Sequence, residues 1–385
     1  MISRRIGSFL TKGRRSFLLL GPRQTGKSTL VASLEPALTI NLMHEPTYLD
    51  FARNPRELEE RIDALPRERS RRAIFIDEVQ RLPSLLNTLQ VLLDEPGGAR
   101  RFWLTGSSAR KLRRGGANLL PGRIHEYRLG PIVAAECRHD LDTRRALSLG
   151  TLPAMLTGDD VADARKTLRT YAATYLKEEV QAEALTRNLE GFARFLTVAA
   201  ERAGQLLDLS KLASTAAVAR QSAVRFFEIL EDSLVVHRLS PFSKSSTRRL
   251  VQHPKYYFFD VGVLNGLLGN FEASADRIGN LFEHLVVTQI IHSAAAFDRE
   301  IRPSTFRTEH GLEVDVVCES GDELWAVEIK ASRNVGAADL RGLRAFADFT
   351  GRKARLAVFY LGEVARRVAG VDVLPWQQGL EEMGF

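Results

Sequence analysis

The fold of this chain is decided by the stretch Gly21-Pro22-Arg23-Gln24-Thr25-Gly26-Lys27-Ser28, which follows directly after the apolar run Phe17–Leu20. It fits the spacing G-x-x-x-x-G-K-[ST], in which two glycines let backbone N–H groups turn inward around a polyphosphate. The next residues, Thr29 to Leu34, have a helical pattern, and a helix N-terminus adds partial positive charge. Lys27 can reach the β- and γ-phosphates, and the Ser28 hydroxyl can bind Mg²⁺. The sequence therefore predicts a strand, a phosphate-binding loop over residues 21–29, and a helix.

Apolar runs and helical patterns alternate through the first third of the chain. The candidate strands are residues 17–20, 38–43, 73–76 and 101–105. The helical patterns between them cover residues 27–34, 55–64 and 84–93. Such alternation predicts an α/β fold with parallel strands and crossover helices on both faces of the sheet.

Two carboxylates follow the third candidate strand, in the order Ile74-Phe75-Ile76-Asp77-Glu78. A buried strand places Asp77 at the phosphate edge, where it can hold Mg²⁺ through a water molecule, and Glu78 can polarise the attacking water. An isolated Asp-Glu pair is usually a solvated turn. The strand before it and the phosphate-binding loop about 50 residues upstream favour the catalytic interpretation.

The fourth candidate strand ends at Thr105 and leads into Gly106, Ser107 and Ser108. Hydroxyl side chains at this edge lie where a γ-phosphate and its attacking water would sit. Here the chain resembles the AAA-type ATPases, in which a polar residue, often Asn, senses the γ-phosphate from this position. The resemblance implies that Ser107 or Ser108 is the sensor.

Arg123 precedes an alternating run, Ile124–Leu129, that is predicted to be a last strand. It is a candidate for an arginine that neutralises transition-state charge, supplied by this subunit or by a neighbour. A surface ion pair is the alternative role for this side chain. Arg23, inside the loop, is the second candidate.

The middle of the chain has the pattern of a long connector helix, then three helices and a β-hairpin. Helical patterns cover residues 162–185, 190–203, 209–213 and 219–230, and hairpin strands are predicted at residues 234–239 and 255–260. This order is typical of a winged helix, which can place the helix Gln221–Glu231 in a DNA major groove. The basic segment Ser243–Arg249 is a further candidate for phosphate contacts. Packing or protein contact is the alternative use of such a domain.

A second set of carboxylates lies in the last third of the chain. Asp315 is on one candidate strand, and Glu328 and Lys330 share one face of the next. This order resembles the restriction-endonuclease-like nucleases. Glu283 lies on the otherwise apolar stripe of a predicted helix, where a carboxylate is costly unless it is paired or bound to a cation. The resemblance implies a second divalent metal held by Glu283, Asp315 and Glu328, with Lys330 catalytic, and Glu313 is an accessory candidate.

Together, these motifs resemble a prokaryotic group of AAA-type ATPases with a C-terminal restriction-endonuclease-like domain. The resemblance implies ATP and Mg²⁺ as ligands. We expect an ATPase domain over residues 1–160, a helical connector with a winged helix over 161–270, and an α/β nuclease-like domain over 271–385. An arginine supplied by a neighbouring subunit would require a homo-oligomer.

The composition is that of a soluble globular protein, with 44% hydrophobic and 26% charged residues in 385. No apolar run approaches the roughly 20 residues that span a bilayer, and no signal peptide is recognisable, so a cytoplasmic location without membrane contact is expected. Cys137 and Cys318 predict neither a disulfide framework nor a metal knuckle. The net charge is +7, and residues 1–130 carry 23 Lys and Arg against 13 Asp and Glu. Charge alone does not indicate DNA binding here.

Two functions follow from this organisation. The first is an ATPase whose nucleotide cycle controls a winged-helix and nuclease-like module that acts on DNA. The alternative is an ATP-dependent switch or protein-remodelling assembly in which the nuclease-like domain is inactive and only binds partners.

Overall fold

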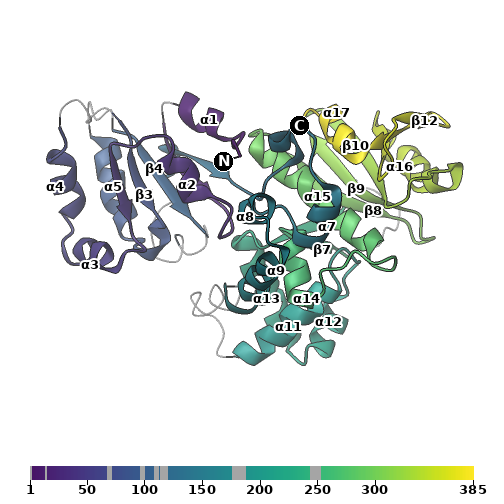
Figure 1. Cartoon of the computed structure of the whole chain (residues 1–385), viewed down its shortest axis with the longest axis horizontal. Coiled ribbons are helices and arrows are strands. Elements are labelled where there is room, and N and C mark those ends of the chain that lie inside the picture. The colour runs from purple at the N-terminus through teal and green to yellow at the C-terminus, as the bar shows by residue number, and fades with distance from the viewer. Residues whose placement is uncertain are drawn as a thin grey trace. The chain divides into compact units, whose positions relative to one another are not determined.

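The computed structural model describes residues 2–13, 15–66, 72–95, 100–107, 112, 120–175, 188–242 and 253–385. Its contacts divide the chain into two compact units. The N-terminal unit contains Ser3–Gly130 with Asp232–Leu234. The C-terminal unit contains Met1–Ile2, Pro131–Glu231 and Val235–Phe385. Figure 1 shows the helices and strands of both units.

The N-terminal unit is built on a five-stranded parallel sheet in the order β2-β3-β4-β1-β5. Its strands are β1 (Ser16–Leu20), β2 (Leu38–Asn41), β3 (Ile74–Asp77), β4 (Phe102–Gly106) and β5 (Ile124–Arg128). The described helices are α1 (Gly7–Lys12), α2 (Lys27–Ala32), α3 (Glu45–Arg53), α4 (Glu57–Asp63), the 3₁₀ turn η1 (Val79–Arg81) and α5 (Leu85–Asp94). The parallel α/β fold predicted from the alternating pattern is therefore confirmed.

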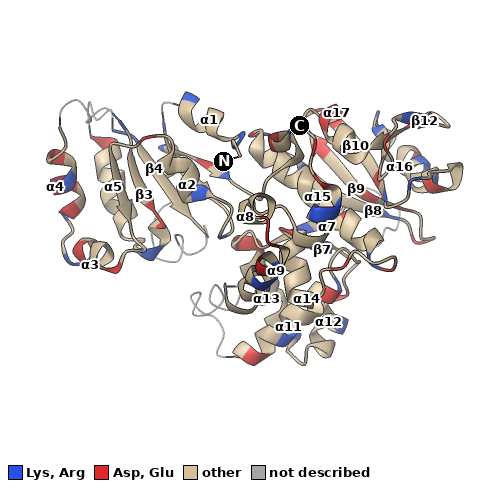
Figure 2. Ribbon diagram, in the orientation of Figure 1, with Lys and Arg blue, Asp and Glu red and all other residues tan. Residues whose placement is uncertain are grey.

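Both faces of this sheet are buried. Successive side chains of a strand point to opposite faces, and those of β1 divide between two apolar clusters. Leu18 and Leu20 belong to one cluster, and Phe17 and Leu19 belong to the other. This two-sided burial explains why the strands read as continuous apolar runs. Charges of both signs lie on the surface helices, as on α4, where Arg61 pairs with Glu57 at 2.6 Å (Figure 2).

The C-terminal unit contains an eight-stranded mixed sheet in the order β12-β13-β11-β10-β9-β8-β6-β7. The strands are β6 (Val236–Pro241), β7 (Lys255–Phe258), β8 (Arg302–Arg307), β9 (Glu313–Ser320), β10 (Glu323–Lys330), β11 (Arg355–Tyr360), β12 (Arg366–Val368) and β13 (Val371–Pro375). Strands β10, β11 and β13 run parallel to one another, whereas β8, β9 and β10 pair antiparallel. The carboxyl ends of β10, β11 and β13 therefore meet at one edge of the sheet.

The C-terminal unit also contains the helices that follow residue 131. They are η2 (Ala134–Cys137), α7 (Thr143–Leu149), α8 (Pro153–Thr157), α9 (Val161–Thr170), the π-helical η3 (Tyr171–Tyr175), α11 (Leu189–Glu201), α12 (Leu209–Thr215), α13 (Arg220–Asp232), α14 (Val261–Leu268), α15 (Ile278–Ala296), η4 (Ala337–Leu340), α16 (Arg341–Thr350) and α17 (Trp376–Glu382). The helix order α11–α12–α13 followed by the antiparallel hairpin β6–β7 is the order expected from the sequence.

The division of the chain differs from the expected domains in two ways. Residues 131–160, expected in the ATPase domain, belong to the C-terminal unit, where α7 packs against α14 and α15. The expected middle and C-terminal domains share one hydrophobic core, and their strands form one sheet because β6 pairs with β8. Pairing between distant strands leaves no trace in local sequence patterns.

Two local expectations also change. The second hairpin strand ends at Phe258 rather than at residue 260, because the Asp260 side chain accepts the N–H of Val263 at 3.0 Å and starts α14. The long helix expected from residue 162 to 185 is regular only to Thr170, and its part after residue 175 lies outside the described residues. The basic segment Ser243–Arg249 and Ser108 also lie outside them. No helix in the described ranges is long and apolar enough to cross a membrane.

Candidate functional site

The phosphate-binding loop joins β1 to α2, as the sequence predicts. Gly26 has φ 90° and Gln24 has φ 64°, so the chain turns through left-handed conformations before the helix begins at Lys27. Lys27 is buried, and its Nζ donates to the carbonyls of Gly21 at 2.8 Å and Pro22 at 3.0 Å. The ammonium therefore lies inside the curve of the loop. This is the position where the negatively charged phosphates of a bound nucleotide would lie.

Close backbone packing at the start of the loop requires glycine. A Cβ at position 21 would lie 2.1 Å from the carbonyl oxygen of Leu129, just after β5. Arg4 fixes the same region, since its guanidinium donates to the carbonyls of Thr25 at 2.6 Å and Gly130 at 2.8 Å. Sequence reasoning missed Arg4 because the residues that it joins are up to 126 positions apart.

Ser28 and Asp77 meet at the carboxyl edge of the parallel sheet. The Ser28 hydroxyl donates to Asp77 Oδ1 at 2.8 Å. The hydroxyl of Thr105, at the end of β4, donates to the same carboxylate oxygen and accepts the N–H of Glu78 at 3.1 Å. Thr105 is completely buried. A hydroxyl and a carboxylate are oxygen ligands of the kind that Mg²⁺ prefers, so these residues fit a magnesium ion.

Glu78 lies next to this pair in a strained backbone conformation. Its φ of 58° is uncommon for a residue other than glycine and is typical of functional sites. The Gln80 amide donates to the Glu78 carboxylate and to the Ser107 hydroxyl, the latter at 3.1 Å. The structure thus brings Glu78 and the expected sensor Ser107 together through Gln80. Sequence reasoning missed Gln80 and Thr105, although both stand within two residues of a predicted site residue.

Arg123 lies at the opposite end of the sheet from this site. It precedes β5, which runs parallel to β1 with Ile124 beside Ser16. The five residues of β1 separate it from the loop, a length of roughly 16 Å at about 3.3 Å per residue. Its guanidinium makes two hydrogen bonds to Asp94, at 2.6 and 2.8 Å, which raise the pKa of Arg123 and lower that of Asp94. Arg23, the second candidate, lies in the loop itself.

The second carboxylate cluster has a different organisation from the expected one. Glu283 on α15 accepts hydrogen bonds at one oxygen, Oε1, from Lys255 Nζ at 2.8 Å and from the Tyr257 hydroxyl at 2.6 Å. Lys255 Nζ also lies 3.8 Å from Asp315 Oδ1. The other oxygen of Asp315 accepts the N–H of Ile329 at 2.8 Å. Lys255 and Tyr257 come from β7, outside the expected nuclease-like domain, so sequence reasoning missed them.

Glu328 and Lys330 lie beside each other on β10, with 2.7 Å between Oε1 and Nζ. The second oxygen of Glu328, Oε2, is buried and has no hydrogen-bond partner among the described residues. Burial, and then the charge of Asp315, raise the pKa of Glu328 to about 8. Burial and the charge of Glu283 likewise raise the pKa of Asp315. Burial lowers the pKa of Lys255, but the neighbouring carboxylates outweigh it and hold the value above the ordinary one.

The cluster does not form the metal-binding set that the resemblance implies. Among the described residues, no group of three or more His, Cys, Asp and Glu side chains is arranged to hold a metal ion. Lys255 joins Glu283 to Asp315, and Lys330 pairs with Glu328. Glu313, the accessory candidate, pairs with Arg307 at 3.0 Å.

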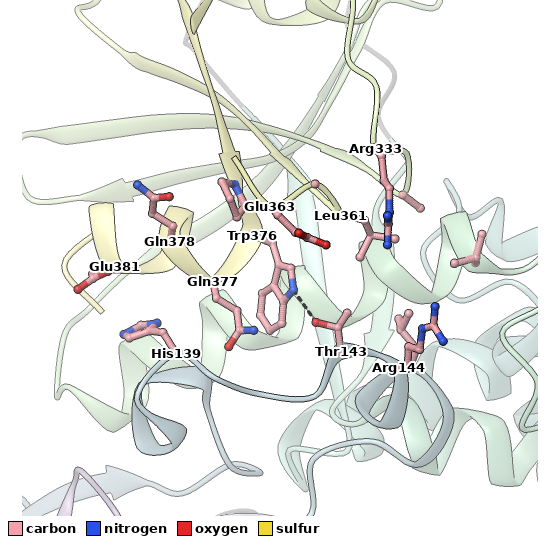
Figure 3. A pocket seen from close by; sticks show the side chains of 15 residues that line it. His139, Thr143, Arg144, Arg333, Leu361, Glu363, Trp376, Gln377, Gln378 and Glu381 are labelled. Atoms are coloured by element: carbon pink, nitrogen blue, oxygen red, sulfur yellow. Dashed lines mark hydrogen bonds between the residues drawn. The ribbon is translucent and has the colours of Figure 1, made fainter. Parts of the chain in front are cut away.

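A cavity of about 780 Å³ opens at the carboxyl ends of β10, β11 and β13 (Figure 3). Ala331, Leu361 and Pro375 mark these strand ends along its wall. The opposite wall comes from residues 139–147, which α17 holds through a hydrogen bond of 3.0 Å from the Trp376 indole to Thr143. The charged lining residues are Arg144, Arg333, Glu363 and Glu381. Ligands of open parallel sheets bind at this edge.

Three family models match consecutive parts of the chain. An AAA domain matches residues 13–137, a domain of unknown function (DUF8612) matches residues 140–274, and a second one (DUF4143) matches residues 278–378. The boundary after residue 137 lies near the division between the two units. A DNA polymerase III gamma subunit-related protein of Thermotoga maritima covers 59% of this chain and 97% of its own at 14% identity. The TM-score of this match is 0.25.

Two curated relatives match at greater length. An uncharacterized protein of Mycobacterium tuberculosis is 30% identical over 355 residues, which are 90% of this chain and 76% of that protein. An uncharacterized protein of Mycobacterium bovis matches to the same extent. The AAA match contains the phosphate-binding loop and all five strands of the parallel sheet, which confirms the expected P-loop ATPase domain. The chain therefore belongs to the family of these mycobacterial proteins, with an AAA-type ATPase domain at residues 13–137.

Proposed function

We propose that the chain is a Mg²⁺-dependent ATP hydrolase whose nucleotide state controls its C-terminal unit. The observation that carries this proposal is that the Ser28 and Thr105 hydroxyls both donate to Asp77. Ser28 directly follows Lys27, whose ammonium is bound by the loop carbonyls. Ser28 and Asp77 would hold Mg²⁺, which neutralises charge on the β- and γ-phosphate oxygens when bound. Lys27 and the loop amides, from Gly21 to Thr29, would bind the phosphates.

The other site residues each have a separate role in the hydrolysis of ATP. Glu78 accepts a proton from the attacking water, and Gln80 positions its carboxylate. Ser107 contacts the γ-phosphate. Arg123 acts on the ATP of a neighbouring subunit, because it lies a strand length from its own loop. The active form is then a homo-oligomer, in which Asp94 releases the arginine when the neighbour binds.

Phosphate release in the presence of Mg²⁺ tests this function. Lys27→Ala should abolish ATP turnover, because it removes the cation at the β- and γ-phosphates. Glu78→Gln should retain ATP binding and lose turnover, which separates the two roles. Undiminished hydrolysis by Lys27→Ala would refute the assignment of the loop.

We propose further that residues 271–385 of the C-terminal unit form a restriction-endonuclease-like module that binds a partner rather than cleaving DNA. The order α15, β8, β9, β10, α16, β11 supports this fold, with Asp315 on β9 and Glu328 and Lys330 on β10. The cavity at the carboxyl ends of β10, β11 and β13 supports binding. On α13, the winged-helix candidate for DNA recognition, Arg220, Gln221 and Arg225 are exposed, and so is the acidic Glu228.

A cleavage assay distinguishes the two uses of this module. Linear and circular DNA are incubated with the chain, with Mg²⁺ or Mn²⁺, and with or without ATP, beside a Glu328→Ala control. The proposal predicts intact DNA under all conditions. Cleavage that depends on Glu328 would refute it and establish the nuclease alternative. ATPase stimulation by a protein rather than by DNA would identify the partner as protein.

A further inference from the structure

The carboxylate cluster of the C-terminal unit contains its own cation. Lys255 Nζ lies 2.8 Å from Glu283 Oε1 and 3.8 Å from Asp315 Oδ1, and its side chain is almost completely buried. We propose that the Lys255 ammonium permanently takes the place of a divalent metal ion between these two carboxylates. This inference rests on the proposed nuclease-like fold of the module. The resemblance to nucleases of that fold implies a metal ion at these carboxylates.

The space between the carboxylates excludes a second cation. A divalent ion ligated by Glu283 and Asp315 needs oxygen distances of about 2.0 to 2.6 Å. Such an ion would meet the ammonium that already contacts the same two oxygens. The Tyr257 hydroxyl donates to the same Glu283 oxygen as Lys255, and the Ile329 N–H donates to Asp315 Oδ2. Lys255 and a metal ion are therefore alternatives.

The strand that carries Lys255 holds it in place. Tyr256, Tyr257 and Phe258 of β7 are buried, and the Tyr256 ring stacks on Phe227 with 4.0 Å between centroids. The Tyr256 carbonyl also accepts the N–H of Gly204 at 2.9 Å. Because β7 is part of the core, its backbone fixes the position of the Lys255 Cα, and the near-complete burial of the side chain restricts its rotation. The ammonium is a fixed part of the cluster rather than a temporary occupant.

The Glu328–Lys330 pair keeps hydrogen-bonding capacity that these contacts do not use. Glu328 Oε2 is buried and has no partner in the part of the chain that the structure describes, and Lys330 is one-third exposed beside it. A ligand can form hydrogen bonds with one carboxyl oxygen and one ammonium there without a metal ion. The pair is thus suited to binding a polar group, while Lys255 excludes a metal ion between Glu283 and Asp315 that could activate water for hydrolysis.

Manganese binding to the full-length chain tests the proposal. Asp77→Asn serves as the background, because it removes a carboxylate of the ATPase magnesium site. Bound Mn²⁺ is counted by electron paramagnetic resonance, without nucleotide, in three proteins: the background, the background with Lys255→Met, and the background with both Lys255→Met and Asp315→Asn. We expect no Mn²⁺ at the cluster in the first, one per chain in the second, and none in the third. Mn²⁺ should also raise the melting temperature of the second protein alone.

Two results would overturn the proposal. One is a Mn²⁺ ion bound to the background protein that is lost when Asp315→Asn is added with Lys255 intact. The other is a folded Lys255→Met protein that gains no Mn²⁺. If Lys255→Met does not fold, the comparison of the background with and without Asp315→Asn decides, and equal binding supports the proposal. The count is independent of the DNA cleavage assay, so either can fail alone.

Discussion

Replacing Thr105 with Val tests whether the end of β4 organises the ATPase site. Valine has nearly the same shape, so the change removes the hydroxyl with little loss of packing in this buried position. Two hydrogen bonds disappear, one donated to Asp77 and one accepted from the N–H of Glu78. Asp77 then keeps the Ser28 hydroxyl as a donor, and the strained backbone of Glu78 loses its anchor.

The size of the effect follows from these two bonds. A hydrogen bond to a charged group contributes about 1.5 to 3 kcal/mol, and a neutral one about 0.5 to 1.5 kcal/mol. If the change removes about 2 kcal/mol of stabilisation from the transition state relative to bound ATP, kcat falls roughly 30-fold. ATP affinity should change little, because the loop and Lys27 are untouched.

The assay is steady-state phosphate release with Mg²⁺, with kcat and KM measured separately and the melting temperature recorded for each protein. Thr105→Ser is the matched control, because it restores the hydroxyl and removes only a methyl group. We expect Thr105→Ser to retain most of the turnover. Equal kcat for Thr105→Val and the unmodified chain would refute the role of this hydroxyl.

Three further changes probe other parts of the chain. Gly21→Ala places a Cβ 2.1 Å from the Leu129 carbonyl, so titration with a fluorescent ATP analogue should show at least about tenfold weaker binding, and an unchanged Kd would contradict the required close approach. Arg123→Ala and Lys27→Ala should each be nearly inactive alone, yet subunit exchange between them should restore part of the ATP turnover, because mixed interfaces combine one intact Lys27 with one intact Arg123. Absence of recovery would contradict action on a neighbour. Burial raises the pKa of Glu328 from its ordinary value of 4.5 to about 8. The protonated carboxyl group therefore contributes its full share to the free energy of unfolding below pH 4.5, and this contribution is lost as the pH rises through 8. The melting temperature of the unmodified chain should therefore fall relative to Glu328→Gln between about pH 5 and pH 9, and parallel curves would show that the pKa is not raised.

Local motifs were enough to predict the ATPase site in outline. The loop at Gly21–Ser28 and the pair Asp77-Glu78 consist of consecutive residues, and each needs only the strand before it to be recognised. The parallel sheet then brings Ser28 and Asp77 together, because the carboxyl ends of parallel strands share one edge. Spacing and strand pattern thus predict this contact without any knowledge of strand order.

Other parts of the site depend on strand order and register, which local patterns do not contain. Thr105 joins Asp77 only because β4 lies beside β3. Arg123 is distant from its own loop because β5 runs parallel to β1. Lys255 enters the carboxylate cluster because the β6–β7 hairpin joins the C-terminal sheet, although the sequence places it in a separate domain.

The sequence by itself therefore determined the nucleotide chemistry, whose motifs are short runs of consecutive residues that occur in a fixed order. Tertiary structure decided which side chains support that chemistry and which cation the second cluster holds. The physical reason is that a buried charge is satisfied by whichever partner the packing brings within hydrogen-bond distance. For Glu283 that partner is Lys255, 28 positions earlier in the chain and on a different element.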